Sequence, residues 1–137
     1  MTRNSPDDAT RRGTSDVEAI EGLLAYAQTG SRWGGAALRR ARDAVARSRA
    51  LAEESPEHTA LLARSLRTMA ALLLKRGRAV EALPVAQEAA ALTRAMGGAP
   101  LVASLMRLAE VYEALHRYSE AAAAMAEADR IPPPEAP

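Results

Sequence analysis

Residues 61–89 read LLARSLRTMAALLLKRGRAVEALPVAQEA, and residues 100–128 read PLVASLMRLAEVYEALHRYSEAAAAMAEA. A shift of 39 residues aligns nine identical pairs in these segments: Leu62/Leu101, Ser65/Ser104, Leu66/Leu105, Ala70/Ala109, Arg78/Arg117, Glu81/Glu120, Ala82/Ala121, Glu88/Glu127 and Ala89/Ala128. Three of the pairs are alanine on alanine, which an alanine-rich chain produces by chance. The other six indicate an internal repeat.

Each copy of the repeat predicts two helices. In the first copy, one apolar stripe with a 3.6-residue period begins at Leu62 and ends before Gly77, and a second begins at Ala82 and ends before Gly97. The second copy has the same order and ends before the prolines at 132–134. No segment shows the two-residue alternation of a half-buried strand, so we predict an all-α fold.

A less regular helix pair precedes the two copies. Residues 15–18, Ser-Asp-Val-Glu, form a capping-box sequence before an apolar stripe that begins at Ile20 and ends near Thr29. After a glycine-containing break, a second stripe runs to about Glu54. We therefore predict six helices, stacked as a short solenoid of about three hairpins. The expected hairpins are residues 16–54, 55–97 and 98–131.

The two ends of the chain differ from this domain in composition. Residues 1–15 have no apolar periodicity, so they cannot bury enough apolar surface to offset the entropy of ordering, and we predict a disordered tail. Residues 132–137 form a proline-rich C-terminal tail. The 137 residues suit one domain, which we place at 16–131.

Composition excludes several classes of protein. The chain has no cysteine, so it has no disulfide framework, thiolate nucleophile or cysteine metal site. No apolar run approaches the ~18 residues of a membrane span, and the first residues lack the apolar core of a signal peptide. We expect a cytoplasmic protein without membrane contact. The formal net charge of +1 gives no general reason to expect nucleic acid as a partner.

The sequence contains no convincing set of catalytic groups. His58 and His116 belong to different predicted helices and lie at their ends. Carboxylates such as Glu110 and Glu113 have the spacing of a solvated helix face. We therefore expect no enzyme, no metal site and no cofactor.

The repeated pattern resembles the tetratricopeptide repeat (TPR) over roughly residues 61 to 133. That family has a bulky residue, a bulky-small pair and a leucine or aromatic residue in its first helix, a glycine-containing turn, and two alanines seven apart in its second helix. The corresponding residues of the two copies are Leu66, Met69-Ala70, Leu73, Gly77, Ala82 and Ala89, then Leu105, Leu108-Ala109, Tyr112, Tyr118, Ala121 and Ala128. The chain is especially similar to long-helix bacterial TPR arrays of the kind that trail actinobacterial NTPase-type regulators.

Two features depart from the usual pattern. His116 stands where the turn glycine is expected, and the 39-residue period exceeds the usual 34. Residues 16–54 would be a degenerate first repeat. Its register is ambiguous, with Leu23, Tyr26-Ala27 and then Ala37 or Ala41 in the equivalent places.

The resemblance implies a noncatalytic protein-interaction module, an adaptor or scaffold that binds a peptide or helix of a partner. The binding groove would be lined by the first helix of each hairpin. The implied groove residues are Arg64, Arg67, Leu74, Lys75, Met106, Arg107, Glu110 and Glu113. TPR domains that hold chaperone carboxylates also use asparagine, and the only asparagine here is Asn4, so we do not expect that clamp in its usual form. Arg64 and Arg67 remain suitable partners for a carboxylate.

The predicted second helix is strongly basic. Opposite its apolar stripe it carries Arg39, Arg40, Arg42, Arg47 and Arg49, with Asp43 as the only opposing charge. Residues 32–49 hold six arginines and one aspartate, a net charge of +5, whereas residues 100–137 hold six acids and three bases, a net charge of −3. This gradient suits steering of an acidic partner or head-to-tail self-association. Our alternative function is a nucleic-acid-associated regulatory protein that uses the arginine face.

Overall fold

The computed structural model describes residues 6–29 and 35–134, with side chains from residue 11 onward. Six α-helices cover most of this part of the chain: α1 (Pro6–Thr29), α2 (Ala36–Glu54), α3 (Thr59–Lys75), α4 (Ala79–Arg94), α5 (Gly98–Ala114) and α6 (Tyr118–Asp129). A 3-10 turn, η1 (Pro56–His58), leads into α3. The described residues contain no strand, and the predicted all-α fold is confirmed.

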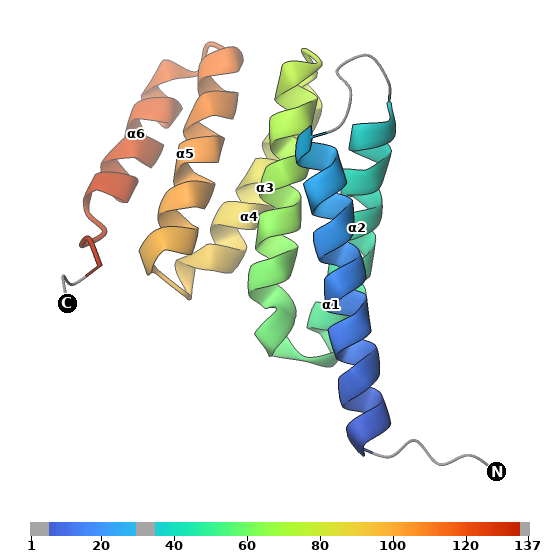
Figure 1. Ribbon diagram of the computed structural model, residues 1–137. Coiled ribbons are helices and arrows are strands. Elements are labelled where there is room, and N and C mark those ends of the chain that lie inside the picture. The colour runs from blue at the N-terminus through green and yellow to red at the C-terminus, as the bar shows by residue number, and fades with distance from the viewer. Residues whose placement is uncertain (1–5, 30–34, 135–137) are drawn as a thin grey trace.

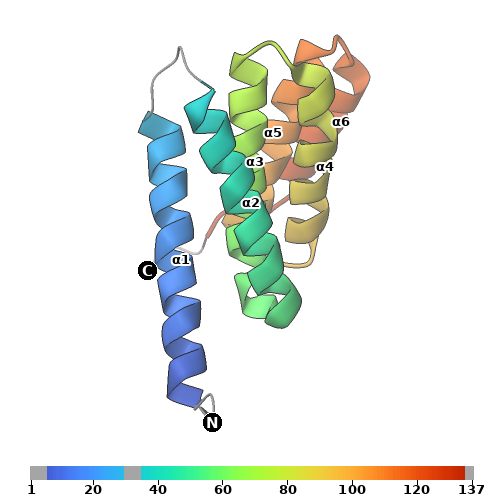
Figure 2. The ribbon, with the colours of Figure 1, turned by 90° about the vertical axis from the view of Figure 1, so that its right-hand side faces the viewer.

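The helices form three antiparallel hairpins that stand side by side, α1–α2, α3–α4 and α5–α6 (Figure 1). Each helix packs against the next along the chain, and α3 also contacts both α1 and α5. In Figure 2 the first helix of each hairpin lies to the left of the second, so α1, α3 and α5 share one side of the array. The predicted solenoid-like stack of helix pairs is therefore confirmed.

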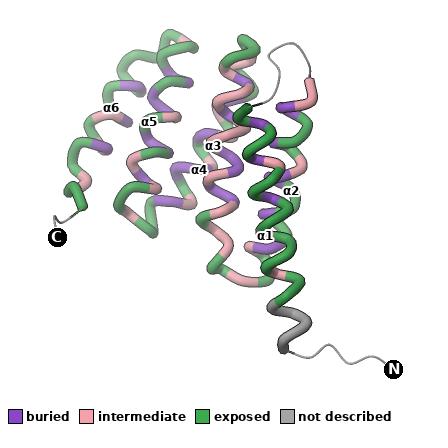
Figure 3. The backbone as a smooth tube through the Cα atoms, viewed as in Figure 1, coloured by how far each residue is buried: buried purple, intermediate pink, exposed green. Residues whose placement is uncertain are grey.

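Alanines on the second helices allow the hairpins to approach closely. Ala82, Ala86 and Ala90 of α4 are fully buried in one cluster with Leu105 and Val111 of α5. Small residues bring helix axes together, and the leucines of the neighbouring helix fill the remaining space. Figure 3 shows buried positions on every helix of the array.

The 39-residue repeat is visible in hydrogen bonds as well as in sequence. The hydroxyls of Ser65 and Ser104 each donate to the carbonyl four residues earlier, at 2.9 and 3.0 Å. Gly77 has a φ of +72° and His116 a φ of +59°, so both turns use a left-handed residue at the same place. Glycine adopts this conformation without strain, whereas a residue with a Cβ does not.

The first hairpin follows the same plan with a longer spacing. A shift of 45 residues matches the buried positions of α2 to those of α4: Ala37/Ala82, Ala41/Ala86, Ala44/Ala89, Val45/Ala90 and Ser48/Thr93. The matched hydroxyls behave alike, since Ser48 donates to carbonyl oxygens three and four residues earlier and so does Thr93. Ala37, rather than Ala41, is thus the equivalent of Ala82.

The register expected for α1 was wrong. Tyr26 is 46% exposed, whereas Ile20 and Leu24 are fully buried and Ala27 is nearly so. A shift of 46 residues therefore relates these positions to α3: Ile20 to Leu66, Leu23 to Met69, Leu24 to Ala70 and Ala27 to Leu73.

The expected disordered tail over residues 1–15 was also wrong in its second part. Residues 1–5 lie outside the described residues, but α1 begins at Pro6 rather than near residue 16. Proline fits the first helical position because its missing N–H would have no intrahelical partner there. Extending a helix that is already packed adds one hydrogen bond per residue without a new nucleation cost. At the other end, residues 132–134 are outside any helix, and 135–137 are not described.

Candidate functional site

Four cationic side chains line one depression on the side of the array formed by the first helices. Its volume is about 440 Å³, and it lies over α3 between α1 and α5. The described residues that line it are Ala27, Gln28, Arg64, Arg67, Thr68, Ala71, Leu72, Lys75 and Arg107. No carboxylate is among these residues, so the depression, which we call the basic groove, has one sign of charge.

The cations of the basic groove are unequally compensated. Arg64 Nη1 lies 3.3 Å from Glu21 Oε1, and Arg107 Nη1 lies 2.6 Å from Glu110 Oε2. Arg67 has only a neutral partner in the described contacts, because its Nη1 donates to Ser104 Oγ at 3.2 Å. Arg64 and Arg107 therefore each have a carboxylate partner, which we place at the rim of the groove, whereas Arg67 at its centre has none among the described contacts.

Burial and like charge act together on Arg67. Desolvation lowers the pKa of its guanidinium, and the neighbouring charges of Arg64 and Arg107 lower that pKa further. The Nε of Arg107 is itself buried and has no hydrogen-bond partner among the described residues. An anion in the groove would stabilise the charged form of Arg67 and would offer a hydrogen-bond acceptor to Arg107 Nε, since opposite charge and hydrogen bonding favour the charged form of a guanidinium.

Four of the eight implied groove residues line this depression, namely Arg64, Arg67, Lys75 and Arg107. Met106, Glu110 and Glu113 are exposed on α5 but are not part of its lining, and Leu74 packs against the main core cluster instead. The structure thus separates a basic groove from the acidic residues that were expected to continue it. Glu110 instead forms an ion pair with Arg107 at the rim.

The contribution of α1 to the groove was missed. Ala27 and Gln28 form part of the lining, and Glu21 of the same helix holds Arg64. The sequence contains a signal for this side, since Glu21 and Gln28 are seven residues apart and lie on one face of a helix. It was not recognised because the register of the first hairpin was uncertain.

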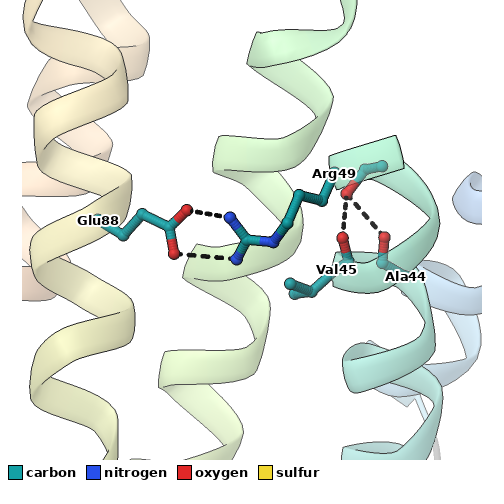
Figure 4. Close-up of polar contacts among 5 residues, drawn as sticks. Ala44, Val45, Arg49 and Glu88 are labelled. Atoms are coloured by element: carbon teal, nitrogen blue, oxygen red, sulfur yellow. Dashed lines mark hydrogen bonds and ion pairs between the residues drawn. The ribbon is translucent and has the colours of Figure 1, made fainter. Parts of the chain in front are cut away.

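In the folded protein, carboxylates neutralise part of the positive charge on the basic face of α2. Arg49 makes two hydrogen bonds to Glu88 of α4, shown in Figure 4, and Arg42 lies 3.8 Å from Glu81 of the same helix. Arg47 pairs with Asp43 at 3.3 Å. The expectation that Asp43 is the only opposing charge was therefore wrong, because α4 supplies two more carboxylates.

The two remaining arginines of this face differ in their surroundings. The guanidinium of Arg40 lies 5.3 Å from the centre of the Tyr26 ring, a cation–π distance, and Arg39 is exposed. Arg32, which contributed to the sequence count of charges, lies outside the described residues together with Trp33.

The histidines do not form a common site. His58 Nε2 lies 3.5 Å from Glu57 before α3, whereas His116 Nδ1 lies 3.0 Å from the Tyr118 hydroxyl at the turn before α6. Within the described ranges no group of three or more metal-ligating side chains is present. None of the helices in these ranges is long and apolar enough to cross a membrane.

A second depression, of about 690 Å³, lies between α1 and the connection from α2 to α3. Its lining includes Arg12, Asp16, Glu54, Glu57 and His58, so both signs of charge are present. It therefore lacks the single-sign character of the basic groove, which is the better candidate for a binding site.

The chain matches no protein-family model, no curated protein and no solved structure. The likeness to TPR proteins consequently rests on the pattern of residues and on the hairpin array. The groove and its charges are the features from which a function can be argued.

Proposed function

We propose that this chain is a noncatalytic, cytoplasmic protein-interaction module that binds an acidic peptide or helix of a partner protein in the basic groove. One observation carries the proposal: Arg67 is partly buried beside Arg64 and Arg107 in a groove whose described lining contains no carboxylate. Bringing like charges together and removing water from them is unfavourable without a ligand. An acidic partner segment offsets that cost.

The groove offers both charged and apolar contacts to such a segment. Guanidinium groups of Arg64 and Arg67 can each form paired hydrogen bonds with a carboxylate, while Lys75 acts as a compact point charge. Ala71 and Leu72 supply apolar surface between them. The volume of about 440 Å³ falls in the usual range of ligand sites, roughly 300 to 1,000 Å³.

A charge-matched peptide experiment tests this proposal. Fluorescent peptides of equal length, built from leucine with glutamate, lysine or glutamine, are titrated with the purified chain. We expect the glutamate peptide to bind and the lysine peptide not to bind, with affinity falling as salt is added. The triple variant Arg67→Gln, Lys75→Gln, Arg107→Gln should bind the glutamate peptide at least about tenfold more weakly.

The control is Arg39→Gln with Arg130→Gln, which removes exposed positive charge outside the groove. Circular dichroism establishes that all variants keep their helical content. Equal binding of the three peptides, or unchanged binding by the folded triple variant, would rule out the proposed site.

Nucleic-acid binding through α2 is the competing function. The exposure of Arg39 and Arg40, for which the described residues provide no ion pair, favours it, but the pairing of Arg42, Arg47 and Arg49 with carboxylates weakens it. A DNA duplex titrated at several salt concentrations distinguishes the two functions. Binding with a steep salt dependence that flattens in the Arg40→Gln, Arg47→Gln variant would move the function to α2.

A further inference from the structure

The repeat register shows which residues of the middle hairpin correspond to residues at the two ends of the array. Some of these middle residues pack against a neighbouring hairpin. With the 45-residue shift, Arg40 and Arg47 of α2 take the places of Val85 and Leu92 of α4. Val85 and Leu92 pack against a cluster that includes Val45 of the preceding hairpin. The α1–α2 end of the array therefore has arginines where the middle hairpin has apolar contact residues.

The α5–α6 end shows the complementary change. The residue of α4 that corresponds to Val45 is Ala90, and the 39-residue shift takes Ala90 to Asp129 of α6. The same shift takes Leu74, which packs against the main core cluster, to Glu113 of α5. Both acids are exposed. This end therefore has carboxylates at positions where the middle hairpin contacts its neighbour.

Apolar surface accompanies the charges at both ends. Met106 is 41% exposed on α5, and Met125 is partly buried on α6. At the opposite end, Tyr26 of α1 is 46% exposed beneath the Arg40 guanidinium. Among the described helices, the backbone of α6 lies close only to α5, with the Arg94–Glu127 ion pair as a link to α4, and α1 packs only on α2 and α3, so no helix covers either end.

We propose that a second copy of this chain docks head to tail, with the α1–α2 end of one copy on the α5–α6 end of the other. The repeat register then places Arg40 and Arg47 of one copy near Asp129 of the other, in the positions that Val85 and Leu92 occupy beside the cluster containing Val45 inside the chain. Charge selects this arrangement. Two like ends would bring arginines against arginines or carboxylates against carboxylates.

A contact of this kind is heterologous, because it joins two different surfaces. Each added copy leaves one α1–α2 end and one α5–α6 end free, so association continues beyond the dimer as concentration rises. Its ionic part is exposed to solvent, so added salt weakens it. This proposal does not depend on the basic groove, which lies on the side of the array rather than at its ends.

Sedimentation velocity of the purified chain over a wide concentration range tests the proposal. We expect the mean mass to rise with concentration and to fall with added salt. The double variant Arg40→Glu, Arg47→Glu and the single variant Asp129→Arg should each self-associate at least about tenfold more weakly. An equal mixture of the two variants should regain association, because it restores opposite charges at every contact.

The matched control is Arg39→Glu, a charge reversal on the same helix that should associate like the unmodified chain. The proposal is overturned if the unmodified chain stays monomeric at every concentration. It is equally overturned if either charge-reversed variant associates like the unmodified chain, as a symmetric contact through the other end would allow, or if their mixture remains monomeric.

Discussion

Arg49 of α2 and Glu88 of α4 are joined by two hydrogen bonds, Nη1 to Oε2 at 2.5 Å and Nη2 to Oε1 at 3.0 Å (Figure 4). The pair connects the second helices of consecutive hairpins, which otherwise touch mainly through α3. The hydrogen bond that Arg49 donates to Glu88 raises the pKa of Arg49. Both side chains are partly exposed, 44% and 35%, so water moderates the strength of the pair.

A double-mutant cycle should measure this connection between hairpins. We expect Arg49→Gln and Glu88→Gln to show a coupling of about 0.5 kcal/mol in the free energy of unfolding, since exposed ion pairs contribute little. Urea unfolding monitored by circular dichroism provides the measurement. The unpaired combination of Arg47→Gln with Glu88→Gln is the control and should be additive, so equal coupling in both cycles would contradict the assignment.

Enlarging Ala82 should destabilise the array. This side chain is fully buried where α4 packs against its neighbours, and its replacement by leucine should cost about 1 to 3 kcal/mol through overpacking. Ala91→Leu, on the exposed face of the same helix, is the matched control and should leave the free energy of unfolding almost unchanged. A tolerated Ala82→Leu would mean that the packing between these helices is looser than the burial indicates.

Replacing His116 by glycine should stabilise the chain. The φ of +59° at this turn is unfavourable for any residue with a Cβ, and glycine removes that strain. The gain should be about 0.5 to 1 kcal/mol, after loss of the contact between His116 and the Tyr118 hydroxyl. Thermal unfolding measures it. Gly77→Ala at the matching turn should have the opposite effect, and stabilisation by both changes would exclude backbone strain as the cause.

The ion pair between Arg94 of α4 and Glu127 of α6 should make stability depend on pH. The hydrogen bond from Arg94 lowers the pKa of Glu127. The folded state therefore binds its proton less readily than the unfolded state, in which the glutamate pKa is about 4.3. The resulting stabilisation is complete above that value and is lost as pH falls through the lower folded pKa.

Urea unfolding of Glu127→Gln at successively lower pH tests this dependence. The variant should be less stable than the unmodified chain at neutral pH, and the difference should shrink in acid. Arg94→Gln should remove the same pH-dependent part, because it takes away the donor. A difference that stays constant from neutral to acidic pH would show that Glu127 contributes only through packing.

Local patterns were enough to predict the helices and their order. Helix faces are marked by residues such as Leu62 and Leu101. Helix ends are marked by Gly77, Pro56 and Pro100, each within a few residues of a boundary in the structure. Such signals depend on the periodicity and conformational preferences of short segments, which the chain carries before it folds. The internal duplication then implied stacked hairpins, since one amphipathic hairpin cannot bury its apolar face alone.

The pairing of charges depended on contacts between distant segments. Arg42 and Arg49 each meet a glutamate 39 residues away on α4, and Arg64 meets Glu21 on α1. Counting charges along one helix could not reveal these partners, because the neighbour of an exposed side chain is set by how hairpins pack. For the same reason, the helical periodicity of α3 indicated Arg67, but only the fold showed it to be the central, uncompensated cation of a groove completed by α1 and α5.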